Sequence, residues 1–260
     1  MQQTDNFYEI DARSKALQTR LKKVPKRILE DFDEKLLVSW IYHDNALEGV
    51  VLSFHELKTA VDERLISDSS LIPLYDEIRA HKQAIDHIRS QAGKQRLAIG
   101  MSTIKKIHAI LVGDEDPSLL HYRKENPLHR VYFHEIAPPE KISYRLRRLV
   151  EWIKSDEFKK GHPIRRAAYI HQTLINIYPW AKDSGKVARL VMNMLLIRDG
   201  YVPAIIHAVD RQKYYEVLRA ATPTPLARLI RDGLATAIDS VHRYITECEE
   251  SEEFKKPSTY

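Results

Sequence analysis

Apolar residues recur at helical spacing along nearly the whole chain, and this periodicity is the strongest constraint on its fold. Ile78, Ala84, Ile85 and Ile88, for example, fall on one face of a helix. Only eight glycines occur in 260 residues, and no period of 20–50 residues repeats, which argues against a solenoid. We therefore expect an all-α fold, with helices over residues 12–23, 27–43, 54–65, 72–91, 101–111, 140–154, 164–177, 186–198, 210–220 and 225–246.

Composition limits the class of protein further. With 43% apolar and 30% charged residues, the chain is expected to form a globular protein with one sizeable core. Its start lacks a basic region followed by an apolar run, and no stretch approaches ~18 consecutive apolar residues, so we expect a cytoplasmic protein without membrane contact. The 41 basic and 36 acidic residues are interleaved, which weighs against nucleic acid as a partner. The single Cys248 excludes an intramolecular disulfide.

One segment departs from the helical pattern. Residues 126–139 contain the aromatic and β-branched run Val131, Tyr132 and Phe133, bounded by prolines and polar residues. This pattern predicts a short β-hairpin flap beside the helices. Such a flap can hold an extended target peptide by main-chain hydrogen bonds, and a surface hairpin without a partner fits the sequence equally well.

A polar loop between two helical patterns is the strongest candidate for a functional site. It runs from Tyr178 to Lys186, at the start of an apolar helix whose free N–H groups and dipole favour anions. Ser184 is a candidate N-cap, Gly185 permits close backbone approach, and Lys186 and Arg189 add positive charge. A phosphate site and a plain capped turn use the same residue types, so both readings stay open.

The sequence around this loop, INIYPWAKDSGKVARLVMNMLLIRDGYVPAII, resembles the signature of the Fic family, HPFx[DE]GN[GK]xxxR, and the helix that follows it. Pro179, Trp180, Gly185 and Arg189 match in kind. Further matches occur in the expected order: Tyr122-Arg123, Pro138-Pro139, and Tyr214-Tyr215, a pair that in relatives lies near the adenine pocket.

Upstream, DNALEGVVLSFHEL resembles the inhibitory helix of family members with the pattern [ST]xxxE[GN]. Asp44 stands at the Ser/Thr position, and Glu48 and Gly49 match. The resemblance implies that Glu48 pairs with Arg189 and hinders seating of a γ-phosphate, although an ion pair that only joins two helices is an alternative. With the resemblance, we expect a Fic-like domain at 37–246, which contains the inhibitory helix at 37–49 and follows an N-terminal helical extension at 1–36. The residues from Glu247 are acidic, then basic, with almost nothing apolar, which predicts a flexible tail at 247–260.

Two positions of the loop depart from the family. There, a histidine acts as general base for attack on the α-phosphate of ATP, and an acid holds Mg²⁺; here these positions are Tyr178 and Lys182. A tyrosine with a pKa of about 10 is a poor base at neutral pH, and an ammonium group cannot bind a metal. Asp183 and Ser184 replace Gly and Asn. His171 is expected to pack at a helix interface and not to replace the missing base.

The leading hypothesis is a Fic-fold pseudoenzyme that keeps a site for ATP or another nucleotide but is not competent for ordinary AMPylation. Mg²⁺ is not expected, and no metal site is predicted. One alternative is a non-standard Fic-derived enzyme, a transferase of altered chemistry, that acts on an anionic or phosphorylated substrate through Tyr178 and Lys182. Whether that substrate is a protein or a small molecule is left open. Another alternative is a module that binds a partner through the flap. A homodimer stays open.

Overall fold

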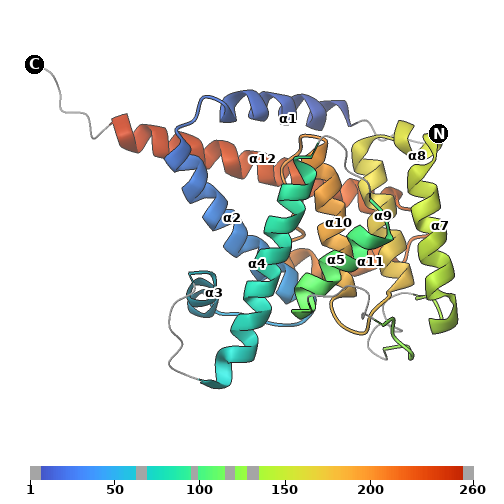
Figure 1. Cartoon of the computed structure of the whole chain (residues 1–260). Coiled ribbons are helices and arrows are strands. Elements are labelled where there is room, and N and C mark those ends of the chain that lie inside the picture. Colours follow the sequence, from blue (N-terminus) through green and yellow to red (C-terminus); the bar gives the residue numbers. More distant parts are fainter. Residues whose placement is uncertain (1–6, 63–68, 95–98, 115–120, 128–134, 254–260) are drawn as a thin grey trace, which may run out of the picture.

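The computed structural model describes residues 7–62, 69–94, 99–114, 121–127 and 135–253. All ten helices expected from the apolar periodicity are present (Figure 1). Within the described ranges the long elements are α1 (Tyr8–Leu21), α2 (Lys26–Leu47), α3 (Phe54–Val61), α4 (Ile72–Ala92), α5 (Met101–Val112), α7 (Ile142–Lys154), α9 (Pro163–Ile177), α10 (Ser184–Arg198), α11 (Arg211–Leu218) and α12 (Thr224–Glu253). Short elements are η1 (Ser69–Leu71), η2 (Pro139–Lys141), α8 (Asp156–Lys160) and η3 (Ala208–Asp210).

Helix α10 lies at the centre of the fold and packs against α9, α4 and α5. Every residue from Ser184 to Leu196 is buried. A helix surrounded by neighbours must be buried on all sides, which explains its run of apolar residues. The helix ends at Arg198, as predicted, and the chain turns at Gly200, which has φ +88°, while Tyr201 N donates to Leu196 O at 2.9 Å.

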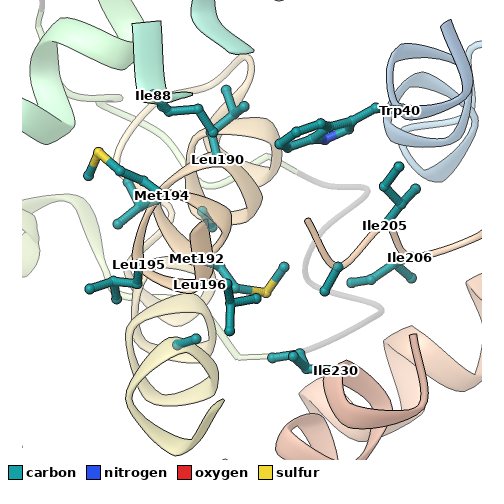
Figure 2. Close-up of a cluster of buried hydrophobic side chains, with 14 of the residues drawn as sticks. Trp40, Ile88, Leu190, Met192, Met194, Leu195, Leu196, Ile205, Ile206 and Ile230 are labelled. Carbon is teal, nitrogen blue, oxygen red and sulfur yellow. The ribbon is translucent and has the colours of Figure 1, made fainter. Parts of the chain in front are cut away.

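Residues far apart in sequence meet around this helix. Figure 2 shows part of the buried cluster, in which Trp40 of α2, Ile88 of α4 and Leu190 of α10 are fully covered. The long helix α12 packs against α9, α1, α2 and α11. The core therefore fixes α2, which carries the predicted inhibitory residues, relative to α10, which begins at the candidate loop.

Several boundaries differ from the expected ones. Helix α2 is continuous through the expected boundary at residue 36, and α12 continues to Glu253, beyond the predicted start of the tail. The extended part of α12 contacts α1, where Arg20 forms an ion pair with Glu249 at 2.8 Å. Helix α8 was not predicted; it is a single capped turn, in which Ser155 Oγ accepts from Phe158 N at 3.1 Å.

The centre of the predicted flap, with Val131, Tyr132 and Phe133, lies outside the described residues. The described flanks, 121–127 and 135–138, contain no strand. The second flank is tied to the candidate site, because Ala137 N donates to Asn176 O of α9 at 2.7 Å. None of the helices in the described ranges combines the length and the apolar character needed to cross a membrane.

Candidate functional site

The candidate loop connects the end of α9 to the start of α10, with two residues in the left-handed region. Tyr178 has φ +47° and ψ +67°, and its N–H donates to Leu174 O at 2.8 Å, so it ends α9. Asp183, with φ +62°, precedes α10 as its N-cap residue. Aspartate tolerates this conformation better than most residues, and glycine adopts it freely, which explains why the Fic signature has glycine there.

Ser184 does not cap α10 as predicted. It is the first helical residue, and its buried hydroxyl accepts from Trp180 N at 2.8 Å and donates to Trp180 O at 2.7 Å. The Ser184 hydroxyl therefore links the end of the loop to the backbone of Trp180, four residues earlier. Trp180 in turn stacks on His108 of α5 with ring centroids 4.0 Å apart, and burial lowers the pKa of His108 to about 4.

Arg123 holds the loop from the other side. Its Nε donates to Tyr178 O at 2.7 Å, its Nη2 donates to Ala137 O and to Ile177 O, and its own N–H donates to Pro179 O at 3.0 Å. The guanidinium thus satisfies carbonyl groups left open where α9 ends. The Tyr-Arg motif pointed to this residue, but the sequence alone did not assign it a role.

The predicted pair between Glu48 and Arg189 is present. Arg189 Nη2 donates to Glu48 Oε1 at 3.0 Å, and the Arg189 side chain is only 2% exposed. The carboxylate of Glu48 also lies over Gly185, because a Cβ on Gly185 would collide with Glu48 Oε1 and would lie 3.2 Å from Arg189 Nη1. A carboxylate of the chain itself therefore occupies the space at the start of α10 that favours anions.

This contact makes a testable prediction for Gly185→Ala. In the wild-type background the new methyl group must push Glu48 away from Arg189, and we expect the free energy of unfolding to fall by about 1–3 kcal/mol. In a Glu48→Gly background the same change should be neutral or stabilising by about 0.5–1 kcal/mol, because alanine favours a helix more than glycine does. Chemical denaturation of the four proteins measures both effects, and loss of stability of equal size in both backgrounds would contradict this placement of Glu48.

A second acid contacts the same arginine. Asp44 Oδ1 accepts from Arg189 Nε at 2.7 Å, and Asp44 O accepts from Arg189 Nη2 at 3.3 Å. The other carboxylate oxygen lies 3.2 Å from His81 Nε2. Burial alone would raise the pKa of Asp44, but Arg189 and His81 outweigh burial and lower the pKa to about 2. Neither Asp44 nor His81 was predicted as a site residue.

The lysines of the loop are also paired. Lys182 Nζ lies 2.6 Å from Glu77 Oε1 of α4, its side chain is 62% exposed, and the hydrogen bond to Glu77 raises the pKa of Lys182. Lys186 Nζ lies 3.2 Å from Asp183 Oδ1, and both side chains are buried. Lys182 therefore extends toward α4, whereas Tyr178, the other predicted catalytic residue, is 2% exposed in the core.

These contacts do not suit Mg²⁺ at the position that the family uses. Lys182 replaces the metal-binding acid and has no lone pair to offer, and Asp183 faces an ammonium group. Within the described ranges, no three His, Cys, Asp or Glu side chains are grouped in a way that would hold a metal. Gly185 at the start of α10 and the buried cations Lys186 and Arg189 have the chemistry to contact an anion, and both cations already pair with acids of the chain.

The tyrosine pair predicted near an adenine pocket contacts the helices around the loop. Tyr215 Oη donates to Leu47 O, the last carbonyl of α2, at 2.9 Å, and Arg211 Nε donates to the same oxygen at 3.2 Å. Tyr214 is buried, with Oη 3.0 Å from His171 Nε2, which confirms that His171 serves a helix interface. Burial raises the pKa of Tyr214. Contact of the pair with a nucleotide stays a prediction.

Comparisons with known proteins agree with this architecture. Residues 98–196 match the model of the Fic/DOC family. The chain is 30% identical over 202 residues to the protein adenylyltransferase Fic of Drosophila persimilis, covering 76% of this chain and 39% of the relative. It is 28% identical over 214 residues to the protein of the same name from Aedes aegypti, covering 81% and 43%. The chain thus spans about two fifths of the length of these curated relatives.

Solved structures show the same fold. A Fic domain containing signaling protein from Bacteroides thetaiotaomicron superposes with a TM-score of 0.73 at 23% identity, over 93% of this chain and 95% of that one. Fic-1 from C. elegans superposes with a TM-score of 0.72 at 22% identity, over 94% and 72%. The fold and the loop thus define a helical, Fic-type protein. The chain belongs to the Fic/DOC family, whose model matches residues 98–196.

Proposed function

We propose that this chain is a Fic-fold protein that retains an anion site for a nucleotide phosphate, closed by its own Glu48, and that does not carry out ordinary AMP transfer. The replacement of the loop base by Tyr178 carries the second half of this proposal. A tyrosine gives up its proton at a pKa of about 10, too high for a general base at neutral pH, and positioned base catalysis is typically worth ~10²–10⁴ in rate.

The anion site rests on the position of the Glu48 carboxylate. It lies over Gly185 and accepts from Arg189 at 3.0 Å, so the start of α10 already stabilises one negative group. Backbone N–H groups and the helix dipole would stabilise a phosphate in the same place. Gly185, Lys186 and Arg189 would provide the contacts, with Asp183 and Ser184 shaping the loop.

A transfer assay tests the proposal. The wild-type chain, the Glu48→Gly variant and the Asp44→Asn/Glu48→Gly variant are incubated with ATP labelled on its α-phosphate, Mg²⁺ and a cell lysate. We expect no labelled protein with any of the three, because removing the internal carboxylates opens the site without supplying a base. Mg²⁺-dependent labelling above the no-enzyme background by any of them would refute the proposal.

Two further variants test which loop side chains any transfer of label requires. Tyr178→His/Lys182→Asp, added to the Asp44→Asn/Glu48→Gly background, restores the base and the metal-binding acid and should be the form best able to label a target. Tyr178→Phe removes only the hydroxyl. If the chain transfers label and loses this activity on Tyr178→Phe, the altered transferase acting through Tyr178 and Lys182 becomes the better reading.

A further inference from the structure

Asp44 is the most deeply placed acid around the candidate loop. Its side chain is 1% exposed, it belongs to α2, and it contacts Arg189 of α10 through both its carboxylate and its backbone carbonyl. In the resemblance described above this position holds Ser or Thr, which carries no charge. The aspartate therefore adds a negative charge at the arginine of the loop.

Asp44 and Glu48 both contact Arg189, but the shorter carboxylate hydrogen bond is the one to Asp44. Asp44 accepts at 2.7 Å from Nε and, through its carbonyl, at 3.3 Å from Nη2. Glu48 accepts at 3.0 Å from Nη2, and its side chain is 16% exposed. Ion pairs excluded from water are screened less, so Asp44 is the stronger partner of the guanidinium.

His81 does not compensate the charge of Asp44. It lies 3.2 Å from Asp44 Oδ2, but it is buried in α4, and burial lowers its pKa. The Asp44 carboxylate acts in the opposite direction, but burial outweighs it, and Lys186 and Arg189 also lower the pKa of His81, so the neutral imidazole is favoured at pH 7. The negative charge of Asp44 is therefore balanced by Arg189.

The charges around the loop then balance without Glu48. Lys182 is paired with Glu77, Lys186 with Asp183, and Arg189 with Asp44, and Glu48 adds one further negative charge. Removing Glu48 clears the space over Gly185 but leaves no cation of the loop in excess. An entering phosphate would meet a neutral set of side chains.

We propose that Asp44 is a second acidic lock on the anion site, which neutralises Arg189 even when Glu48 is absent. This inference rests on the proposed anion site. It implies that removing the glutamate alone does not open this chain to nucleotides, because the arginine must also be released from Asp44.

A double-mutant cycle tests the second lock. Wild type, Glu48→Gly, Asp44→Asn and Asp44→Asn/Glu48→Gly are titrated with ADP and with inorganic tripolyphosphate at pH 7.5 without metal, by isothermal calorimetry and by thermal shift. Asparagine keeps the shape and the oxygen acceptor of Asp44 but removes the charge. We expect each single variant to bind less than about threefold more tightly than wild type, and the double variant at least about tenfold more tightly.

The possible outcomes distinguish a failure of the Asp44 proposal from a failure of the proposed anion site. If Glu48→Gly binds as tightly as the double variant, Asp44 is not a second lock, while the anion site stands. If none of the four proteins binds either ligand, the proposed anion site itself is wrong, and the lock with it. Circular dichroism establishes folding of each variant, and Asp44→Ser/Glu48→Gly, which removes the same charge, replaces the asparagine variant if that one is unfolded.

Discussion

Replacing Arg189 by methionine is expected to lower the free energy of unfolding at pH 7 by about 3–5 kcal/mol. Methionine fills a similar volume, but it leaves the carboxylates of Asp44 and Glu48 without their cation in a site that is almost closed to water. A buried charge that has lost its partner retains the full cost of its desolvation. Urea denaturation of the two proteins measures the difference.

The pH dependence of this loss follows from Asp44. Its pKa in the folded chain is about 2, below the ordinary value of 3.8, so the Arg189 contact stabilises the fold fully above pH ~4 and loses this effect as the pH falls toward 2. In Arg189→Met the carboxylates can take up protons without losing a partner. The stability difference between wild type and variant should therefore shrink on acidification.

Two further proteins serve as controls. Arg198→Met removes an arginine from the same helix, where it pairs with its neighbour Asp199 at 3.3 Å and is 25% exposed, and should cost less than about 1 kcal/mol. Asp44→Asn/Glu48→Gln in the Arg189→Met background removes the orphaned charges and should recover most of the loss. If the triple variant is no more stable than Arg189→Met, packing and not charge explains the effect.

Arg123→Ala is expected to be the second strongly destabilising change, by more than about 3 kcal/mol. It removes the donors for the carbonyls of Tyr178, Ile177 and Ala137, and each buried acceptor left without a donor costs about 1–3 kcal/mol. The end of α9 should also loosen, so the amides from Trp180 to Ser184 should exchange hydrogen faster. Denaturation and hydrogen exchange measure the two effects.

Matched variants test whether geometry matters at Arg123. Lysine keeps the charge but cannot reach several carbonyls with a planar fork of donors, so Arg123→Lys should recover less than half of the lost stability. Arg147→Ala, on the exposed face of α7, should change stability by no more than about 0.5 kcal/mol. Full recovery by lysine would show that the charge alone holds the loop.

The helices could be predicted because their apolar periodicity reports burial directly. Helix α4 illustrates the rule: Ile78, Ala84, Ile85 and Ile88 were placed on one face, and all four are buried. The sequence also contains one exception to this apolar pattern, because His81 falls on the same face of α4. A histidine in a buried stripe needs a polar neighbour, and this signal could have led to Asp44.

Side-chain direction in the loop could not be predicted in the same way. Ser184 was predicted as a cap and Lys182 as a catalytic residue of the altered enzyme, but the left-handed backbone at Asp183 shifts the cap by one residue. Glu77, more than a hundred residues away in sequence, draws Lys182 toward α4. Such long-range pairs depend on tertiary packing, which local patterns do not report.

Hydrogen bonds from α11 to the end of α2 connect the tyrosine pair with the helix that carries Glu48. Tyr215 and Arg211 both donate to Leu47 O, one residue before Glu48, so both side chains contact the end of the helix that carries Glu48. A movement of the last turn of α2 would break both hydrogen bonds and displace Glu48 as well. The Tyr215 hydroxyl and the proposed anion site are therefore coupled through one carbonyl group.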